Sequence, residues 1–394
     1  MKVKNLKRLC SFLLLYLGYM LLFADRTVLN ISLAYIGKDF HIGAAALGTT
    51  ASAFFLGYTL MQIPGGYLAD RFGSKVMIIL SLLLWSIMTV VTGWAWSLIS
   101  LIIIRFIFGI AEGPYPSAAL KKISEDYGEK EKAQATSALI SSNYLGAVVA
   151  PLIIVPIIAA SSWRFSFVWL GVAGLIILFL YYLLERPINS ERKEKLSHQK
   201  IDWKNIDNRL WAFIIIGLAL NVITKGLETW MPVYFLQARK INLKSLTWLV
   251  PLPTLAGGIA AFIAGFVMVH VFRNHERWMI TVSSFLTLIF MFGLYKSASL
   301  GAIVSFEMLV YFFKSLAFTG IFSFISQIIL EKQYGSAVGI VNFGGQLGGF
   351  IGPLLIGLVV QYSGSYTVAF LSLVFSALIA VIACLFIKKK EVTE

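Results

Sequence analysis

Long apolar stretches separated by short polar segments run along the whole chain. Most of these stretches reach roughly 20 residues, the length that an α-helix needs to cross a bilayer. The pattern predicts an all-α integral membrane protein with twelve transmembrane helices. Their expected ranges are 10–35, 46–67, 76–96, 98–120, 134–160, 164–184, 210–237, 245–271, 278–295, 299–330, 335–361 and 365–387.

The composition supports this prediction and excludes several classes of protein. Of the 394 residues, 58% are hydrophobic and 13% are charged, whereas a soluble protein carries about 25% charged residues. The formal net charge of +14 would suit a nucleic-acid-binding protein. The basic residues flank apolar stretches and form no separate domain, so we expect no nucleic-acid partner. The sequence has no phosphate-binding loop, zinc-protease motif or nucleophile elbow, so we expect neither an enzyme nor a cofactor or metal site.

The distribution of basic residues predicts the orientation in the membrane. If both termini are cytoplasmic, the cytoplasmic segments hold 23 of the 33 Lys and Arg residues, the outer loops 6 and the spans 4. Cytoplasmic loops of membrane proteins are enriched in Lys and Arg. We therefore expect a multi-pass protein of the cytoplasmic membrane with both termini inside.

A polar segment and an internal repeat predict two domains. The segment 186–209 is a cytoplasmic linker between a six-helix bundle at 1–185 and a second bundle at 210–394. A shift of 202 residues superimposes matching positions of the two halves, which indicates parallel copies related by a pseudo-two-fold axis. The matched pairs are Gly146 and Gly348, Pro151 and Pro353, Arg105 and Glu307, and Glu112 and Lys314.

Eight charged residues lie deep inside the predicted spans, and all are in the first and fourth span of each half. They are Asp25, Arg26, Arg105, Glu112, Lys225, Glu228, Glu307 and Lys314. A charge at mid-membrane depth costs roughly 2.5–3.5 kcal/mol on insertion scales. We infer that these four helices line one aqueous cavity. In the alternative interpretation the charges are buried ion pairs that fix helix packing, which stays open above all for the second half.

Other residues inside the spans are polar or small. Asn143 and Gln346 either bind a substrate or satisfy a neighbouring helix, and Trp230 lies beside Glu228, close enough in sequence to face the same cavity. The glycines of span eleven, including Gly344, Gly348 and Gly352, form small-xxx-small patterns that permit close helix packing.

The segment Gly66–Lys75 resembles the signature loop of the major facilitator superfamily. It falls between spans two and three, and Arg273 and Arg277 occupy the equivalent loop of the second half. The resemblance implies the major facilitator fold. Asp70 is placed to pair with Arg71 or to cap a neighbouring helix. We expect Asp70, Arg71, Lys75, Arg273 and Arg277 to form a cytoplasmic gate that opens when the halves rock.

A narrower resemblance covers nearly the whole chain. Asp25-Arg26, Arg105 followed by Glu112-Gly113-Pro114, and Thr229–Tyr234 are similar to segments of the anion:cation symporter family, which includes bacterial sugar-acid transporters and the sialic acid and vesicular glutamate transporters. The resemblance implies that Asp25 and Glu112 are the protonatable pair and that Arg26 and Arg105 bind the substrate carboxylate. It also places Tyr58, Asn143 and Asn342 among the substrate contacts.

Together these features predict a proton-coupled symporter of an organic anion, such as a sugar acid, that works by alternating access. We expect its partners to be a small carboxylate, protons and the lipid bilayer, and we expect a monomer. Lys225, Glu228, Trp230, Lys314 and Gln346 complete the predicted substrate-binding set. The balanced charges leave room for a zwitterionic or multiply charged substrate. Two alternatives stay open, namely a proton-driven exporter of a zwitterionic metabolite, metallophore or drug-like compound, and a membrane receptor that transports nothing.

Overall fold

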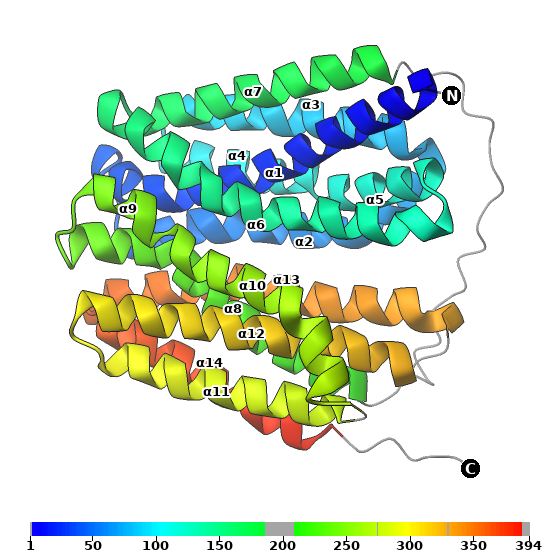
Figure 1. Cartoon of the computed structure of the whole chain (residues 1–394). Coiled ribbons are helices and arrows are strands. Elements are labelled where there is room, and N and C mark those ends of the chain that lie inside the picture. The colour runs from blue at the N-terminus through cyan, green and yellow to red at the C-terminus, as the bar shows by residue number, and fades with distance from the viewer. Residues whose placement is uncertain (1, 186–208, 274, 329–330, 388–394) are drawn as a thin grey trace. The chain divides into compact units, whose positions relative to one another are not determined.

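The computed structural model describes residues 2–185, 209–273, 275–328 and 331–387 (Figure 1). Within these residues all regular secondary structure is helical. The helices are α1 (Lys2–Asp39), α2 (Ala44–Phe72), α3 (Ser74–Gly93), α4 (Leu98–Glu112), α5 (Tyr115–Asp126), α6 (Glu129–Ala160), α7 (Trp163–Leu184), α8 (Arg209–Gln237), α9 (Leu243–Leu249), α10 (Pro251–His270), α11 (Glu276–Lys296), α12 (Leu300–Ile328), α13 (Glu331–Ser363) and α14 (Tyr366–Leu385). The all-α class predicted from the sequence is confirmed.

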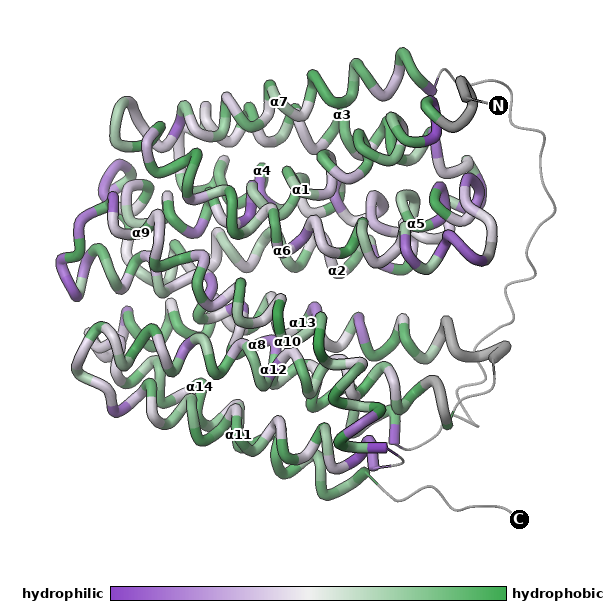
Figure 2. The backbone as a smooth tube through the Cα atoms, viewed as in Figure 1, coloured by the Kyte–Doolittle hydropathy of each residue, from purple (hydrophilic) through white to green (hydrophobic). Residues whose placement is uncertain are grey.

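Twelve segments of the described chain are long and apolar enough to cross a membrane. Two of them contain a break, because α4 and α5 together form the segment Leu98–Asp126, and α9 and α10 form Leu243–His270. The sequence prediction of a fourth span at 98–120 did not include the break. Hydrophobic residues run along the helices, and hydrophilic ones gather towards helix ends and loops (Figure 2).

The described residues form two compact units. Unit 1 comprises Met1–Ile42, Thr49–Ser197 and Phe235–Trp248, and unit 2 comprises Gly43–Gly48, His198–Tyr234 and Leu249–Glu394. The domains 1–185 and 210–394 stay a prediction. Residues 186–208 of the predicted linker lie outside the described residues.

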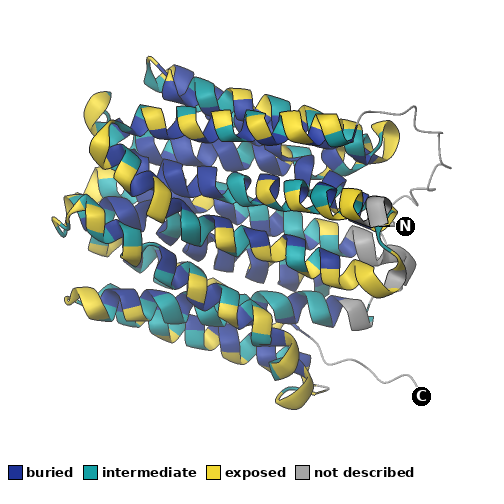
Figure 3. Cartoon of the chain, turned by 45° about the horizontal axis from the view of Figure 1, so that its top comes forward, coloured by how far each residue is buried: buried dark blue, intermediate teal, exposed yellow. Residues whose placement is uncertain are grey.

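Each helix turns its apolar side chains both to its neighbours and to the outside. In Figure 3 buried and exposed positions alternate along individual helices. Some large hydrophobic side chains are almost fully exposed, such as Phe262 at 90% and Ile99 at 71%. A soluble protein rarely exposes so much contiguous apolar surface, whereas lipid tails accept it without cost.

In unit 1, helices α2 and α4 approach each other through glycines. A Cβ atom on Gly57 would collide with the backbone oxygen of Phe106, and one on Gly109 would collide with that of Phe54 and lie 2.7 Å from the nitrogen of Tyr58. This close packing places the α4 segment between Arg105 and Glu112 directly against α2. Sequence reasoning did not identify Gly57 and Gly109, because isolated glycines in an apolar run give no pattern.

The break between α4 and α5 is due to Gly113 and Pro114. Proline has no N–H to donate to the carbonyl four residues earlier, so α4 ends at Glu112 and α5 begins at Tyr115. Tyr115 is fully buried, and its hydroxyl donates to the Leu15 carbonyl of α1 at 3.1 Å. The Glu112 carboxylate lies at this break and is fully buried. Glu112 therefore needs a cationic partner.

In unit 2, the predicted close packing of the α13 glycines is confirmed. A Cβ atom on Gly352 would lie 2.5 Å from the Val222 oxygen of α8, and one on Gly344 would lie 2.6 Å from the Ile214 side chain. A Cβ atom on Gly348 would collide with the Leu218 oxygen. The stripe of small residues thus brings α13 against α8, the helix that carries Lys225 and Glu228.

We predict that Gly109→Ala destabilises the protein, since the added methyl group overlaps the α2 backbone. Overpacking of this kind costs roughly 1–3 kcal/mol. Thermal unfolding of the purified protein in detergent measures the effect. Gly265→Ala is the matched control, because a Cβ atom at that helical position of α10 meets nothing within 4 Å. Equal melting temperatures for the two variants would contradict the packing described for α2 and α4.

Candidate functional site

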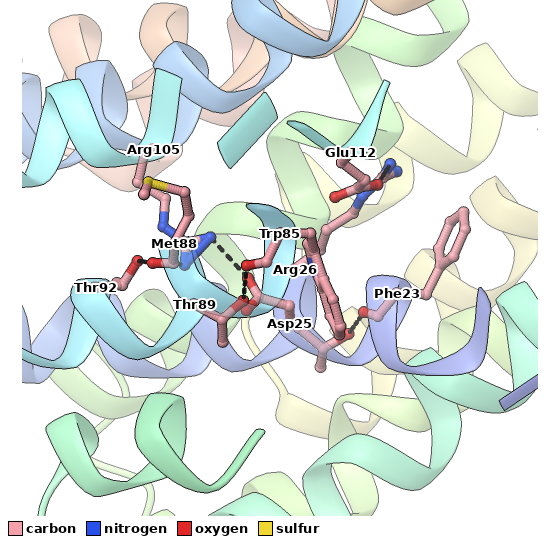
Figure 4. Close-up of polar contacts among 10 residues, drawn as sticks. Phe23, Asp25, Arg26, Trp85, Met88, Thr89, Thr92, Arg105 and Glu112 are labelled. Atoms are coloured by element: carbon pink, nitrogen blue, oxygen red, sulfur yellow. Dashed lines mark hydrogen bonds and ion pairs between the residues drawn. The ribbon is translucent and has the colours of Figure 1, made fainter. Parts of the chain in front are cut away.

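Two ion pairs join α1 to α4 in the middle of unit 1 (Figure 4). Arg105 donates from Nη1 to Oδ1 of Asp25 at 2.7 Å, and Arg26 donates from Nη2 to Oε1 of Glu112. Asp25 and Arg26 are neighbours on α1, so their side chains diverge. Arg105 and Glu112 are two turns apart on one face of α4. Each residue of α1 therefore reaches the oppositely charged residue of α4, and the four charges cancel.

These four side chains are buried and almost inaccessible to solvent. Their exposed fractions are 0% for Asp25, 6% for Arg26, 1% for Arg105 and 0% for Glu112. We expected them to line an aqueous cavity, but in this structure they are closed against each other inside the helix bundle. The physical reason is that each charge has a partner, which compensates for its removal from water. Removing one member would leave an unpaired buried charge, which typically costs 3–5 kcal/mol.

Aromatic rings surround the Arg26 guanidinium. Its Cζ lies 4.5 Å from the ring centre of Phe23, 4.8 Å from that of Phe54 and 4.7 Å from that of Tyr58. Such cation–π contacts are worth about 2 kcal/mol when desolvated. The structure thus brings the predicted Tyr58 to Arg26. Phe23 and Phe54 were missed, because phenylalanine in an apolar span does not stand out.

Arg105 has its own set of partners. Its Cζ lies 4.6 Å from the ring centre of Phe108 and 5.0 Å from that of Phe167. Its Nη2 donates to Oγ1 of Thr92 at 3.3 Å, and this hydroxyl donates to the Met88 carbonyl at 2.8 Å. The site therefore includes α3 and α7, which sequence reasoning did not assign to it. The threonines and serines of α3 were the only available signal.

Several polar atoms at this site retain unused bonding capacity. Among the described residues, Oδ2 of Asp25, Oε2 of Glu112 and Nε of Arg105 have no hydrogen-bond partner, although all three are buried. The amide oxygen of Asn143 on α6 is also without one. A buried polar atom without a partner costs roughly 1–3 kcal/mol. The two carboxylates can each accept a proton or a donor, and Arg105 can donate once more to a ligand.

The charges of unit 2 are arranged differently. Lys225 and Glu228 form an ion pair within α8, with 19% and 22% of their side chains exposed. The Lys314 ammonium lies 4.6 Å from the ring centre of Phe318. Glu307 is only 3% exposed. The sequence left open whether Lys225 and Glu228 pair within their own helix, and the structure shows that they do. Glu307 and Lys314 form no recorded pair within the described chain.

The other residues predicted to bind substrate in unit 2 fall into two groups. Trp230 is fully buried, and its indole N–H donates to the Pro353 carbonyl at 2.9 Å. In this structure it packs α8 against α13 and has no free donor to offer. Asn342 and Gln346 are half-buried on α13.

At the loop between α2 and α3, Asp70 pairs with Lys121 of α5 at 2.7 Å, and the same ammonium donates to the Ala69 carbonyl at 3.0 Å. We expected Asp70 to pair with Arg71 or to cap a helix. Arg71 instead lies over the Phe72 ring, with 5.3 Å between Cζ and the ring centre. Neighbouring side chains on a helix point apart, so a lysine from another helix is better placed.

Lys75 pairs with Glu185 at 2.9 Å, and Lys122 lies 3.6 Å from the same carboxylate. In unit 2, Arg273 is exposed and Arg277 is half-buried. Burial tends to raise the pKa of Glu185, but the hydrogen bond from Lys75 and the charges of Lys122 and Lys75 outweigh it, so the pKa lies below its ordinary value.

We predict that Glu185→Gln lowers the stability of the protein at neutral pH by roughly 1–3 kcal/mol, as for hydrogen bonds to charged groups. A carboxyl group with a lowered folded-state pKa stabilises the fold above its unfolded-state pKa and loses that contribution as the pH falls through the folded-state value. The difference in melting temperature between wild type and variant should therefore shrink in acid. Glu131→Gln, which removes an exposed ion pair with Arg8, should have little effect at any pH. A Glu185→Gln difference that is independent of pH would contradict this role.

Comparisons with known proteins agree with this architecture. The model of the Major Facilitator Superfamily matches residues 15–312 and 276–394. Two solved structures share the fold. A bacterial homologue of the human lysosomal transporter Spinster, in an inward-facing and occupied conformation, gives a TM-score of 0.80 at 19% identity and covers 95% of each chain. A mutant of the nucleoside transporter NupG gives a TM-score of 0.79 at 14% identity, over 97% of this chain and all 100% of that one.

Curated relatives are similar along almost the whole chain. The probable sulfoacetate transporter SauU of Cupriavidus necator is 26% identical over 378 residues, which is 90% of this chain and 88% of that protein. The hexuronate transporter of Bacillus subtilis is 27% identical over 386 residues, covering 91% and 89%. The probable galactarate/D-glucarate transporter GudP of Escherichia coli is 25% identical over 403 residues, covering 92% and 89%.

Proposed function

Because the chain belongs to the Major Facilitator Superfamily, we propose that it is a proton-coupled symporter of an organic anion that works by alternating access. Membership confirms the superfamily predicted from the loop motif and the twelve-helix fold. The relatives named above are transporters and not enzymes, and their substrates are organic acids. The substrate of the proposed symport is accordingly a small carboxylate, such as a sugar acid.

The crossed ion pairs of unit 1 are the observation that carries the proposal. A substrate carboxylate can replace a side-chain carboxylate on Arg26 or Arg105, since a guanidinium group binds carboxylates bidentately. The displaced carboxyl group of Glu112 or Asp25 then lies in a dry, apolar site without a cation. Taking up a proton restores neutrality there. Substrate binding and proton binding are thus coupled through the same pairs.

The same coupling answers an energetic requirement of uptake. The membrane potential opposes entry of an anion by roughly 2.3 kcal/mol per charge per 100 mV. One proton per monoanion removes this opposition, and a second proton lets the potential drive uptake. An exporter would need the reverse coupling, and the organic-acid substrates named for the relatives give it no particular support.

Three further expectations belong to the proposal. The excess of basic residues in the cytoplasmic segments supports a multi-pass protein of the cytoplasmic membrane with both termini inside. We expect a monomer, because the crossed pairs lie within one chain. The contact of Asp70 with Lys121 supports a gating role for the cytoplasmic loop, in which this pair closes and opens as the protein changes conformation.

We predict that Glu112→Gln lowers the accumulation driven by a pH gradient about tenfold per pH unit, because glutamine cannot bind or release a proton. Proteoliposomes are loaded at one pH, diluted into another and assayed with sulfoacetate, D-glucarate and a hexuronate. Exchange of internal for external substrate should persist, because it needs no net proton movement. The exposed Glu131→Gln serves as control. Accumulation by Glu112→Gln at the wild-type level would show that Glu112 is not the coupling group.

We predict that Arg105→Lys weakens substrate binding at least tenfold, since an ammonium group offers no planar fork to a carboxylate and stacks less well on Phe108 and Phe167. Binding is measured by thermal shift or calorimetry with the substrate that the uptake assay identifies. Arg164→Lys is the matched control, because Arg164 pairs with Asp39 near the helix ends, away from the crossed pairs. Unchanged affinity in Arg105→Lys would count against carboxylate binding by this residue.

A further inference from the structure

Unit 2 contains a buried carboxyl group to which nothing above assigns a function. Glu307 lies in the second turn of α12, and its side chain is 3% exposed. Within the described chain it takes part in no recorded hydrogen bond or ion pair. Asp25 and Glu112 differ from it, because each has an arginine partner.

An ionised carboxylate is costly in such a place. Transfer of an unpaired charge into a protein interior costs several kcal/mol even after the surroundings relax, and the membrane adds to this cost. The neutral acid avoids the cost, because it carries no net charge. In the buried conformation described here, Glu307 therefore holds a proton.

Few other ionisable groups are near enough to change this. The helices α10 and α11, which pack against α12, carry their ionisable residues only at their ends, namely His270, Glu276, Arg277, Tyr295 and Lys296. The described part of α13 from 337 to 363 carries only Tyr362, at its C-terminal end. On α8 the charged residues are Lys225 and Glu228, and on α12 itself Lys314 lies two turns beyond Glu307.

Tyr311 lies on the same face of α12 as Glu307 and reaches α8 beside the partly exposed ion pair. It lies one turn after Glu307 on α12, and its hydroxyl donates to the Thr224 carbonyl of α8 at 3.2 Å. Glu228 and Lys225 are about one-fifth exposed. The Tyr311 hydroxyl therefore lies on α8 next to Lys225, on the helix face of α12 that also carries Glu307.

We propose that Glu307 is a second proton-binding site of the transport cycle, with Tyr311 as the relay. The proposal rests on the symport proposed above and adds a proton to it. A proton from the outer solution binds the Glu307 carboxylate and is released to the cytoplasm in the same cycle, separately from the proton bound at Asp25 or Glu112. One monoanion and two protons then enter together, which moves one net positive charge inward.

The protonation state is tested first, because this test needs no substrate. Infrared spectra of wild type and Glu307→Gln in lipid at neutral pH are compared in the region of the carbonyl stretch of a protonated carboxyl group. The wild type should show a band that is missing in Glu307→Gln and shifted but retained in Glu307→Asp. Identical spectra in this region would overturn the proposal.

The second test measures the charge moved. Proteoliposomes are given a fixed pH gradient and a membrane potential set by potassium and valinomycin, and the monoanion D-glucuronate is the probe, with D-gluconate and glutamate beside it. Wild-type accumulation should rise about tenfold for each 59 mV, as for one net charge. Glu307→Gln should still respond to the pH gradient and lose its response to the potential, and Glu307→Asp should keep both. A Glu307→Gln variant with the wild-type response to potential would overturn the proposal.

This design separates the two proposals. If symport itself is wrong, the wild type shows no accumulation driven by the pH gradient. If only the second site is wrong, the wild type accumulates substrate and Glu307→Gln behaves like it. Tyr311→Phe adds a test of the relay, because loss of the hydroxyl should slow initial uptake at least tenfold while the final accumulation stays the same. An unchanged rate would remove Tyr311 from the proposal.

Discussion

The crossed ion pairs between α1 and α4 are the interaction on which the site depends. On α1, Asp25 pairs with Arg105 of α4, and the next residue, Arg26, pairs with Glu112 of α4. Every charge in the cluster therefore has a partner of opposite sign. This arrangement requires close helix packing, which Gly57 and Gly109 provide, and it requires α4 to end at Glu112.

A neutral cluster of this kind can exchange partners without leaving a buried charge. A carboxylate substrate brings one negative charge, and one bound proton removes it again, so the sum of charges in the cluster stays the same. A state in which only the substrate or only the proton is bound is costly, because the cluster then carries a net charge while shielded from water. Coupling in this account is therefore a consequence of electrostatic balance and requires no separate device. In unit 2 the buried Glu307 stands apart from this balance, because no cation accompanies it.

Much of the fold and part of the site could be predicted from the sequence. Apolar stretches of the right length define twelve spans, and four charges inside them locate the central cluster, because charged residues are rare at that depth. Phe54, Thr92 and Phe167 were not predictable, since their residue types are ordinary in a span and only the packing brings them to the arginines. The predicted pairing of Asp70 with Arg71 was wrong for a related reason. Its observed partner, Lys121, becomes its neighbour only when α5 packs against α2.

In the proposed mechanism, substrate binding and proton binding occur at the same ion pairs. The most direct measurement is the pH change that follows substrate addition to the purified protein in a weakly buffered detergent solution, recorded with an indicator dye. We predict that the wild type takes up protons as its transported carboxylate binds, and that the uptake saturates with the same substrate dependence as binding. Saturable binding without proton uptake, or with proton release, would contradict the account.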